Sequence, residues 1–174
     1  MLFLILILFI IITSLFIQVR EFITPDNYLI SIKDRLRPFF DPKNVTFKGI
    51  LKGLNDGNII DKIPISKGEK SYTINKEKIY ICLKDEDKEY YNENMLIYVI
   101  LHEIGHVLCK SEGHTQEWHT IFKALQSYAN KRGFWDAKEP IVNNYCEVPN
   151  DPNDNSEPDT NTKTIESPKT THVK

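Results

Sequence analysis

The stretch MLIYVILHEIGHVL, residues 95–108, decides the fold that we expect for this chain of 174 residues. Its apolar character predicts a helix, and a helix places positions four apart on one face, about one turn from each other. His102 and His106 can therefore bind one metal ion together. Glu103 lies about 100° round the helix from His102, close enough to take a proton from a water that the metal acidifies. This H-E-x-x-H arrangement predicts the chemistry of a zinc peptidase, with Glu103 as general base.

A tetrahedral catalytic zinc needs a third protein ligand and keeps its fourth position for water. His114 is the strongest candidate, because Gly113 can bend the chain after the helix and the loop is long enough to return to the metal. Glu117 and His119 are the alternatives, and Glu117 can instead accept a hydrogen bond from a ligand histidine. Cys109 is a weaker candidate, and as a fourth ligand it would leave no room for water.

Further elements flank this helix. Residues 71–74 and 79–83 are β-rich runs that predict a hairpin, and Asn92 is the expected N-cap of the helix that follows. Residues 117–131 carry an apolar stripe at helical spacing and stop before Gly133, which predicts a second amphipathic helix.

The preceding part of the chain carries weaker signals. Thr24 as N-cap and Pro25 at the first position predict a helix that ends at Pro38. Residues 45–51 and 59–65 read as short extended segments on either side of a turn. The fold class expected is therefore α+β, with a small antiparallel-rich β-sheet packed beside the H-E-x-x-H helix and the second amphipathic helix.

The amino terminus is apolar over residues 2–19, interrupted only by Thr13, Ser14 and Gln18. A membrane-spanning helix needs about 20 such residues, and no basic segment or small-residue cleavage site indicates a signal peptide. We therefore expect residues 1–19 to form a single-pass anchor that contacts the lipid bilayer through residues 2–19. Lysine and arginine follow the span and none precedes it, which favours a cytoplasmic domain.

The cysteines support the same orientation. Cys82, Cys109 and Cys146 are odd in number, far apart and without a C-x-x-C pair, which is typical of reduced thiols in a cytosol. Residues 20–146 remain for a zinc metallopeptidase-like domain. Residues 147–174 contain six acids and three lysines with few aliphatic residues, so we expect a disordered polar tail.

The overall composition excludes some functions. The 22 basic and 24 acidic residues leave no net positive charge, no basic stripe argues for nucleic acid, and no glycine-rich phosphate loop is present. There are 23 Ile, 18 Lys and 14 Asn against 3 Ala, a bias typical of AT-rich genomes such as those of some large DNA viruses.

The sequence HEIGH at 102–106, followed by GHTQEW at 113–118, resembles the small minigluzincin-type WLM and SprT-like peptidases. Their pattern is H-E-x-x-H, a short variable loop, then Gly-His and an aromatic residue. The resemblance implies a compact zinc protease domain that binds one Zn²⁺ through His102, His106 and His114, with Glu103 as general base. Some members of this group cleave proteins crosslinked to DNA. The apolar amino terminus and the lack of a DNA-binding extension depart from such a role and favour a host or virion membrane.

The sequence as a whole predicts a membrane-anchored zinc metalloprotease that acts on a protein or peptide substrate. One alternative is a non-catalytic zinc module tethered to a membrane, used for display or assembly. The other is a structural membrane protein in which the H-E-x-x-H pattern is accidental.

Overall fold

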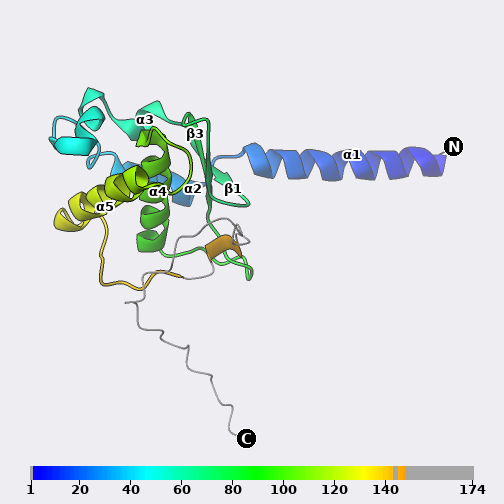
Figure 1. The fold of residues 1–174 in the computed structure, drawn as a ribbon. Coiled ribbons are helices and arrows are strands. Elements are labelled where there is room, and N and C mark those ends of the chain that lie inside the picture. Colours follow the sequence, from blue (N-terminus) through cyan, green and yellow to red (C-terminus); the bar gives the residue numbers. More distant parts are fainter. Residues whose placement is uncertain (1, 143–144, 148–174) are drawn as a thin grey trace, which may run out of the picture.

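The computed structural model describes residues 2–142 and 145–147 (Figure 1). It has the expected α+β architecture, with one three-stranded sheet in the strand order β1-β3-β2. Strand β1 (Ile65–Gly68) pairs with β3 (Lys78–Cys82) in parallel, and β2 (Tyr72–Ile74) pairs with β3 antiparallel. The predicted hairpin is thus confirmed as β2 and β3. The expectation of an antiparallel-rich sheet is wrong, because one of the two strand pairings is parallel.

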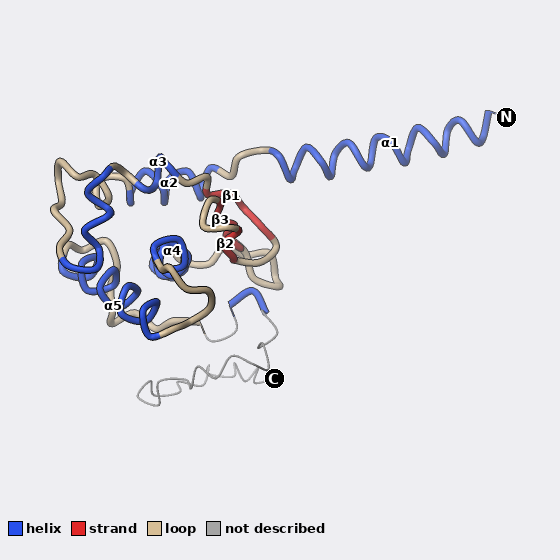
Figure 2. Tube along the Cα trace, turned by 45° about the horizontal axis from the view of Figure 1, so that its top comes forward, coloured by secondary structure: helices blue, strands red, loops and turns tan. Residues whose placement is uncertain are grey.

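Helix α4 (Glu93–Leu108) lies at the centre of the domain, between the sheet and helix α5 (Gln116–Lys131) (Figure 2). Asn92 is its N-cap as predicted, because its side-chain oxygen accepts a hydrogen bond from the Met95 amide. Neighbours on several sides explain why residues 95–108 are apolar around most of the helix. The most deeply buried side chains of α4 are Leu96, Ile97, Ile100, Leu101 and Ile104.

Helix α5 confirms the second amphipathic helix. The Thr115 hydroxyl accepts a hydrogen bond from the Trp118 amide and caps its start. Gly133, with φ of +70°, follows its end, where a residue without a Cβ is favoured. Four residues of the predicted apolar stripe are buried, Trp118, Ile121, Phe122 and Leu125, whereas the fifth, Tyr128, is half-buried. Ala129 is also buried, and α5 packs against α4 and residues 49–56.

Helix α2 (Asn27–Leu36) confirms the first helix of the domain, but its N-cap lies two residues later than predicted. Asp26, not Thr24, is the N-cap, since its Oδ1 accepts hydrogen bonds from the amides of Tyr28 and Leu29. A carboxylate that satisfies two free amides is the better cap, and its charge also complements the helix dipole.

The prediction of a strand-like extended segment at residues 45–51 is wrong, because no strand forms there. The chain there leads into a 3₁₀ helix, η1 (Gly49–Asp56). The reason is the side chain of Asn55, which accepts a hydrogen bond from the Phe47 amide and donates one to the Phe47 carbonyl. Those two backbone groups are the ones that a neighbouring strand would have used.

The extended segment predicted at residues 59–65 is also wrong over most of its length. Residues Ile59–Lys62 form a single helical turn, α3, and only Ile65 belongs to a strand. Asn58 caps this turn by accepting a hydrogen bond from the Ile60 amide. The cap overrides the local β preference of the isoleucines.

Helix α1 (Leu2–Ile23) extends away from the domain (Figures 1 and 2). Its large apolar side chains between Ile5 and Phe16 are 39–67% exposed. In the part of the chain that the structure describes, no helix combines the length and the apolarity needed to cross a membrane. The anchor expected at residues 1–19 therefore stays a prediction. The tail expected at residues 147–174 lies outside the described residues, apart from Glu147.

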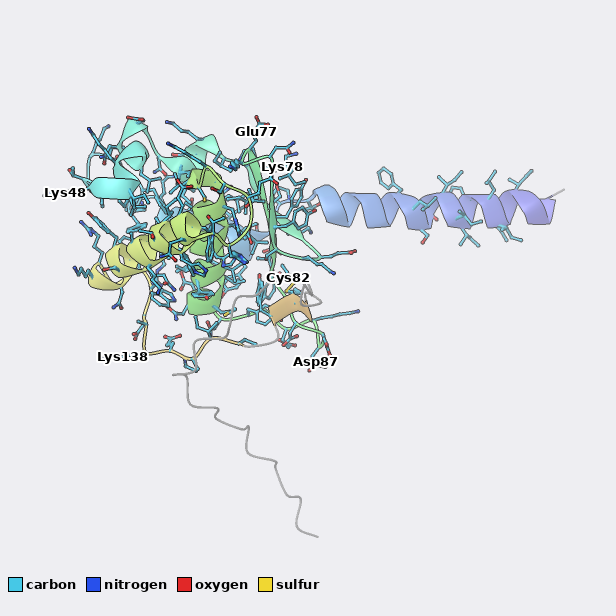
Figure 3. The ribbon with its side chains drawn as sticks, in the orientation of Figure 1. Lys48, Glu77, Lys78, Cys82, Asp87 and Lys138 are labelled. Carbon is cyan, nitrogen blue, oxygen red and sulfur yellow. A yellow bond between two sulfur atoms is a disulfide. The ribbon has the colours of Figure 1, made fainter. Side chains whose placement is uncertain are left out.

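The cysteines differ from the prediction. Cys82, at the end of β3, forms a disulfide with Cys146, whereas Cys109 is free and buried (Figure 3 labels Cys82). The expectation of three reduced thiols is therefore wrong for two of them. The segment after α5 returns to β3, where the Tyr145 hydroxyl donates a hydrogen bond to the Cys82 carbonyl. Sequence spacing cannot reveal a pairing across 64 residues.

Candidate metal centre

Three histidines from two segments meet at one point. His102 and His106 lie one turn apart on α4, and His114 comes from the loop between α4 and α5. The Nε2 atoms of His102 and His106 are 3.2 Å apart, and that of His114 is 3.2 Å from His106 and 3.1 Å from His102. Among the described residues, these three form the group that can hold a metal ion. The predicted ligand set is thus brought together.

The separations fit zinc. A tetrahedral ion with Zn–N bonds of about 2.0–2.1 Å holds its ligand atoms about 3.3 Å apart. The three Nε2 atoms are 3.1–3.2 Å apart, so a small outward adjustment admits the ion. Gly113 permits the sharp turn that delivers His114, because its φ of +74° is a conformation that side chains with a Cβ rarely adopt.

The protonation of the site also suits a metal. Burial, and to a smaller extent the nearby His114 and Lys76, lower the pKa of His106 to about 4. The imidazole of His106 is therefore neutral at pH 7. A metal ligand must be unprotonated, so this side chain is ready to bind without losing a proton.

Glu103 occupies a buried position next to β2. Its side chain is 4% exposed, and this burial raises its pKa to about 7. The Thr73 hydroxyl donates a hydrogen bond of 2.7 Å to Glu103 Oε2, which works in the opposite direction. A carboxyl group with a pKa near neutral can both accept and return a proton. The sequence does not predict this contact, because nothing in the spacing of Thr73 connects it with residue 103.

Trp118 forms one wall of the site. Its indole is 4% exposed and packs against all three imidazoles, with ring centroids 4.6 Å from His102, 5.2 Å from His106 and 4.3 Å from His114. The His106 ring is stacked on the indole, whereas the His102 ring meets it edge-on and the His114 ring is tilted. A Cβ on Gly105 would lie 3.0 Å from the Trp118 Nε1. Glycine inside the H-E-x-x-H motif therefore gives the indole its place. The sequence identified Trp118 as a core aromatic, and contact with the ligands is its second role.

The other candidate ligands lie elsewhere. Glu117 Oε2 accepts hydrogen bonds from the Ser111 hydroxyl at 3.3 Å and the Cys109 thiol at 3.5 Å. Glu117 and Cys109 therefore organise the loop that carries His114. The ring of His119 is centred 6.5 Å from that of His114, and His119 does not belong to the three-histidine group.

The β2–β3 hairpin also holds this loop. Lys76 Nζ donates a hydrogen bond of 2.6 Å to the Lys110 carbonyl. The hairpin turns without glycine because Asn75 and Lys76 themselves adopt φ values of +49° and +59°. The tip of the hairpin thus reaches the segment between His106 and His114.

The chain is similar to two viral proteins. It is 47% identical over 127 residues to the uncharacterized protein 136R of Invertebrate iridescent virus 6, covering 69% of this chain and 71% of the relative. It is 43% identical over 111 residues to the uncharacterized protein 042R of Invertebrate iridescent virus 3, covering 63% and 70%. No protein-family model matches the chain. No solved structure matches it either. The viral relatives agree with the composition, which indicated an AT-rich genome.

Proposed function

The chain belongs to a family of iridescent-virus proteins that includes 136R and 042R, and we propose that it is a zinc-dependent peptidase. The observation that carries the proposal is the meeting of three imidazole nitrogens, 3.1–3.2 Å apart, beside a buried glutamate. An accidental H-E-x-x-H pair has no reason to meet a third histidine from a separate loop. The pattern HEIGH…GHTQEW is our ground for grouping the domain with WLM and SprT-like peptidases.

In this proposal, bound zinc would polarise the scissile carbonyl and acidify a water molecule. Glu103 takes the proton from that water and returns it to the leaving amine, a task suited to a carboxyl group with a pKa near 7. Thr73 engages Oε2 of Glu103, so we assign the proton transfer to Oε1. His102, His106 and His114 would hold the ion.

The sheet suggests how a substrate lies. Strand β2 is at one edge of the sheet and contacts α4 beside Glu103. An edge strand has unpaired backbone groups, and an extended peptide can pair with them as an added strand. The substrate class that fits is therefore an extended or unfolded protein segment.

Metal content and cleavage test the proposal together. We expect the purified full chain to carry one zinc ion, His114→Ala to lose most of it, and His119→Ala to retain it. The wild type should cleave an unfolded protein such as reduced casein. Glu103→Gln should keep its zinc and lose at least about 100-fold in rate, since it cannot accept the proton.

Two results would point elsewhere. Unimpaired cleavage by Glu103→Gln rules out the mechanism. A stably zinc-loaded wild type that cleaves no unfolded protein favours the non-catalytic zinc module instead.

We also propose that α1 inserts into a lipid bilayer. The support is the apolar sequence of residues 2–19 and the exposure of the large apolar side chains from Ile5 to Phe16. Such side chains are stable in lipid and unfavourable in water. The full chain should stay with membranes after alkaline carbonate extraction, and recovery in the supernatant contradicts insertion.

A further inference from the structure

The disulfide indicates where the domain resides. Cys82 and Cys146 are bonded across 64 residues, and this bond encloses α4, the histidine loop and α5. Disulfides of this structural kind form and persist in oxidising compartments and are rare in the cytosol. The cytoplasmic orientation relied on flanking charges and on reduced cysteines, and the second of these grounds is wrong.

A modification sequence lies on the surface of the same domain. Asn44-Val45-Thr46 matches the acceptor pattern for N-linked glycans. The side chains of Asn44 and Thr46 are exposed, whereas Val45 between them is 5% exposed and fixes the segment to the core. The side-chain amide of Asn44 donates a long hydrogen bond of 3.4 Å to the Pro38 carbonyl and is exposed, so the acceptor nitrogen is accessible.

The position of this segment leaves room for a glycan. Asn44 ends a turn in which its backbone N–H donates a hydrogen bond to the Asp41 carbonyl. Lys48, four residues further on, lies on the side of the domain away from α1 (Figure 3). Asn44 itself is exposed, so a glycan on its side chain would extend into solvent.

From the disulfide and the exposed acceptor we infer that the domain lies on the lumenal side of a secretory membrane and that Asn44 is N-glycosylated. In this reaction the anomeric carbon of a lipid-linked oligosaccharide forms a bond to Asn44 Nδ2. The bond to the lipid diphosphate breaks, the diphosphate leaves, and the amide nitrogen loses one proton. The inference rests on the proposed membrane insertion of α1 and is independent of peptidase activity.

Cell-free translation of the full chain with endoplasmic-reticulum microsomes tests the inference. We expect one reduction in gel mobility that a glycan-removing amidase reverses. Asn44→Gln and Thr46→Ala should each abolish it, and Thr46→Ser should retain it because serine also completes the acceptor. After denaturation, a thiol-reactive polyethylene glycol should add to one cysteine of the wild type without reductant and to three with it.

Failure of the glycosylation inference and failure of the proposed membrane insertion give different results. A membrane-bound chain without a glycan overturns the inference and restores the orientation predicted from flanking charges. An unmodified chain in the alkaline supernatant overturns it together with the proposed insertion of α1. A mobility change that persists in Asn44→Gln assigns the glycan to another residue and also overturns the site.

Discussion

At the scale of single residues, Glu103 is the charged side chain that the described core buries. Its pKa in the folded protein, about 7, exceeds its ordinary value of 4.5. As the pH rises from 4.5 to 7, the unfolded chain releases a proton that the folded chain keeps, so the free energy of unfolding falls. The full loss above pH 7 corresponds to about 3 kcal/mol.

We therefore expect Glu103→Gln to stabilise the metal-free protein by up to about 3 kcal/mol at pH 8 and to have almost no effect at pH 4. Urea denaturation in the presence of a chelator measures both values. The exposed Glu112 provides the control, since Glu112→Gln should change neither. An equal gain at both pH values would show that ionisation of Glu103 is not the cause.

Gly105 supports the metal site because the absence of a side chain there leaves space for the Trp118 indole. In Gly105→Ala, the new Cβ would lie 3.0 Å from Trp118 Nε1, so the indole that contacts the three imidazoles must move slightly. Alanine favours the helix by about 1 kcal/mol, so the domain should remain folded. We expect the dissociation constant for zinc to rise about 10-fold, an effect typical of residues that orient metal ligands. Competition with a chromogenic chelator measures this constant.

Gly53→Ala is the matched control, because a Cβ at Gly53 meets nothing within 4 Å. Equal zinc affinities for Gly105→Ala and Gly53→Ala would show that the Trp118 contact does not support the site.

At the scale of elements, the hairpin and the histidine loop act as a pair. Lys76→Met removes the hydrogen bond to the Lys110 carbonyl that joins them. We expect amide hydrogen exchange in residues 110–114 to become faster and zinc to bind several-fold more weakly, since His114 then has a more mobile loop. Lys78→Met is the control on the same hairpin, because Lys78 Nζ lies over the Tyr80 ring instead. Equal exchange in the two variants would exclude the proposed support.

The elements also show what local sequence could predict. Helix α4 was predictable from its apolar run and its N-cap Asn92, and helix α5 from its apolar stripe and the glycine that follows its end. The conformation of residues 45–51 was not predictable from local sequence. The side chain of Asn55, in the 3₁₀ helix η1, forms hydrogen bonds with the backbone amide and carbonyl of Phe47. Isoleucine-rich residues 59–65 were misjudged for a similar reason, since a cap at Asn58 outweighs their β preference.

At the scale of the whole molecule, the disulfide joins the sheet to the end of the described chain. In a chain-entropy model, a closed loop of this length contributes about 4 kcal/mol to stability. We therefore expect the double variant Cys82→Ser/Cys146→Ser to lose up to about 4 kcal/mol of unfolding free energy in denaturant titrations. Reducing agent should cause the same loss in the wild type and no further loss in the double variant. If reducing agent lowers the unfolding free energy of the double variant as well, Cys109 is involved instead.

The candidate site was predictable only in part. His102, Glu103 and His106 follow from their spacing on one helix, and Gly113 made His114 the strongest candidate for the third ligand. The sequence left Glu117 and His119 as alternatives, because loop direction determines which side chain returns to the metal. The fold resolved this because Glu117, in the first turn of α5, accepts a hydrogen bond from Ser111 of the loop and does not belong to the three-histidine group.

The sequence alone determined the central helix, its cap and the paired histidines, since all of these depend on residues within a few turns of one another. Only the tertiary structure decided that His114 completes the group, that Thr73 holds Glu103, that Trp118 covers the imidazoles and that Cys82 pairs with Cys146. The physical reason is the range of the interactions. Helical periodicity is a local property of the chain, whereas contacts between distant segments depend on how every element between them packs.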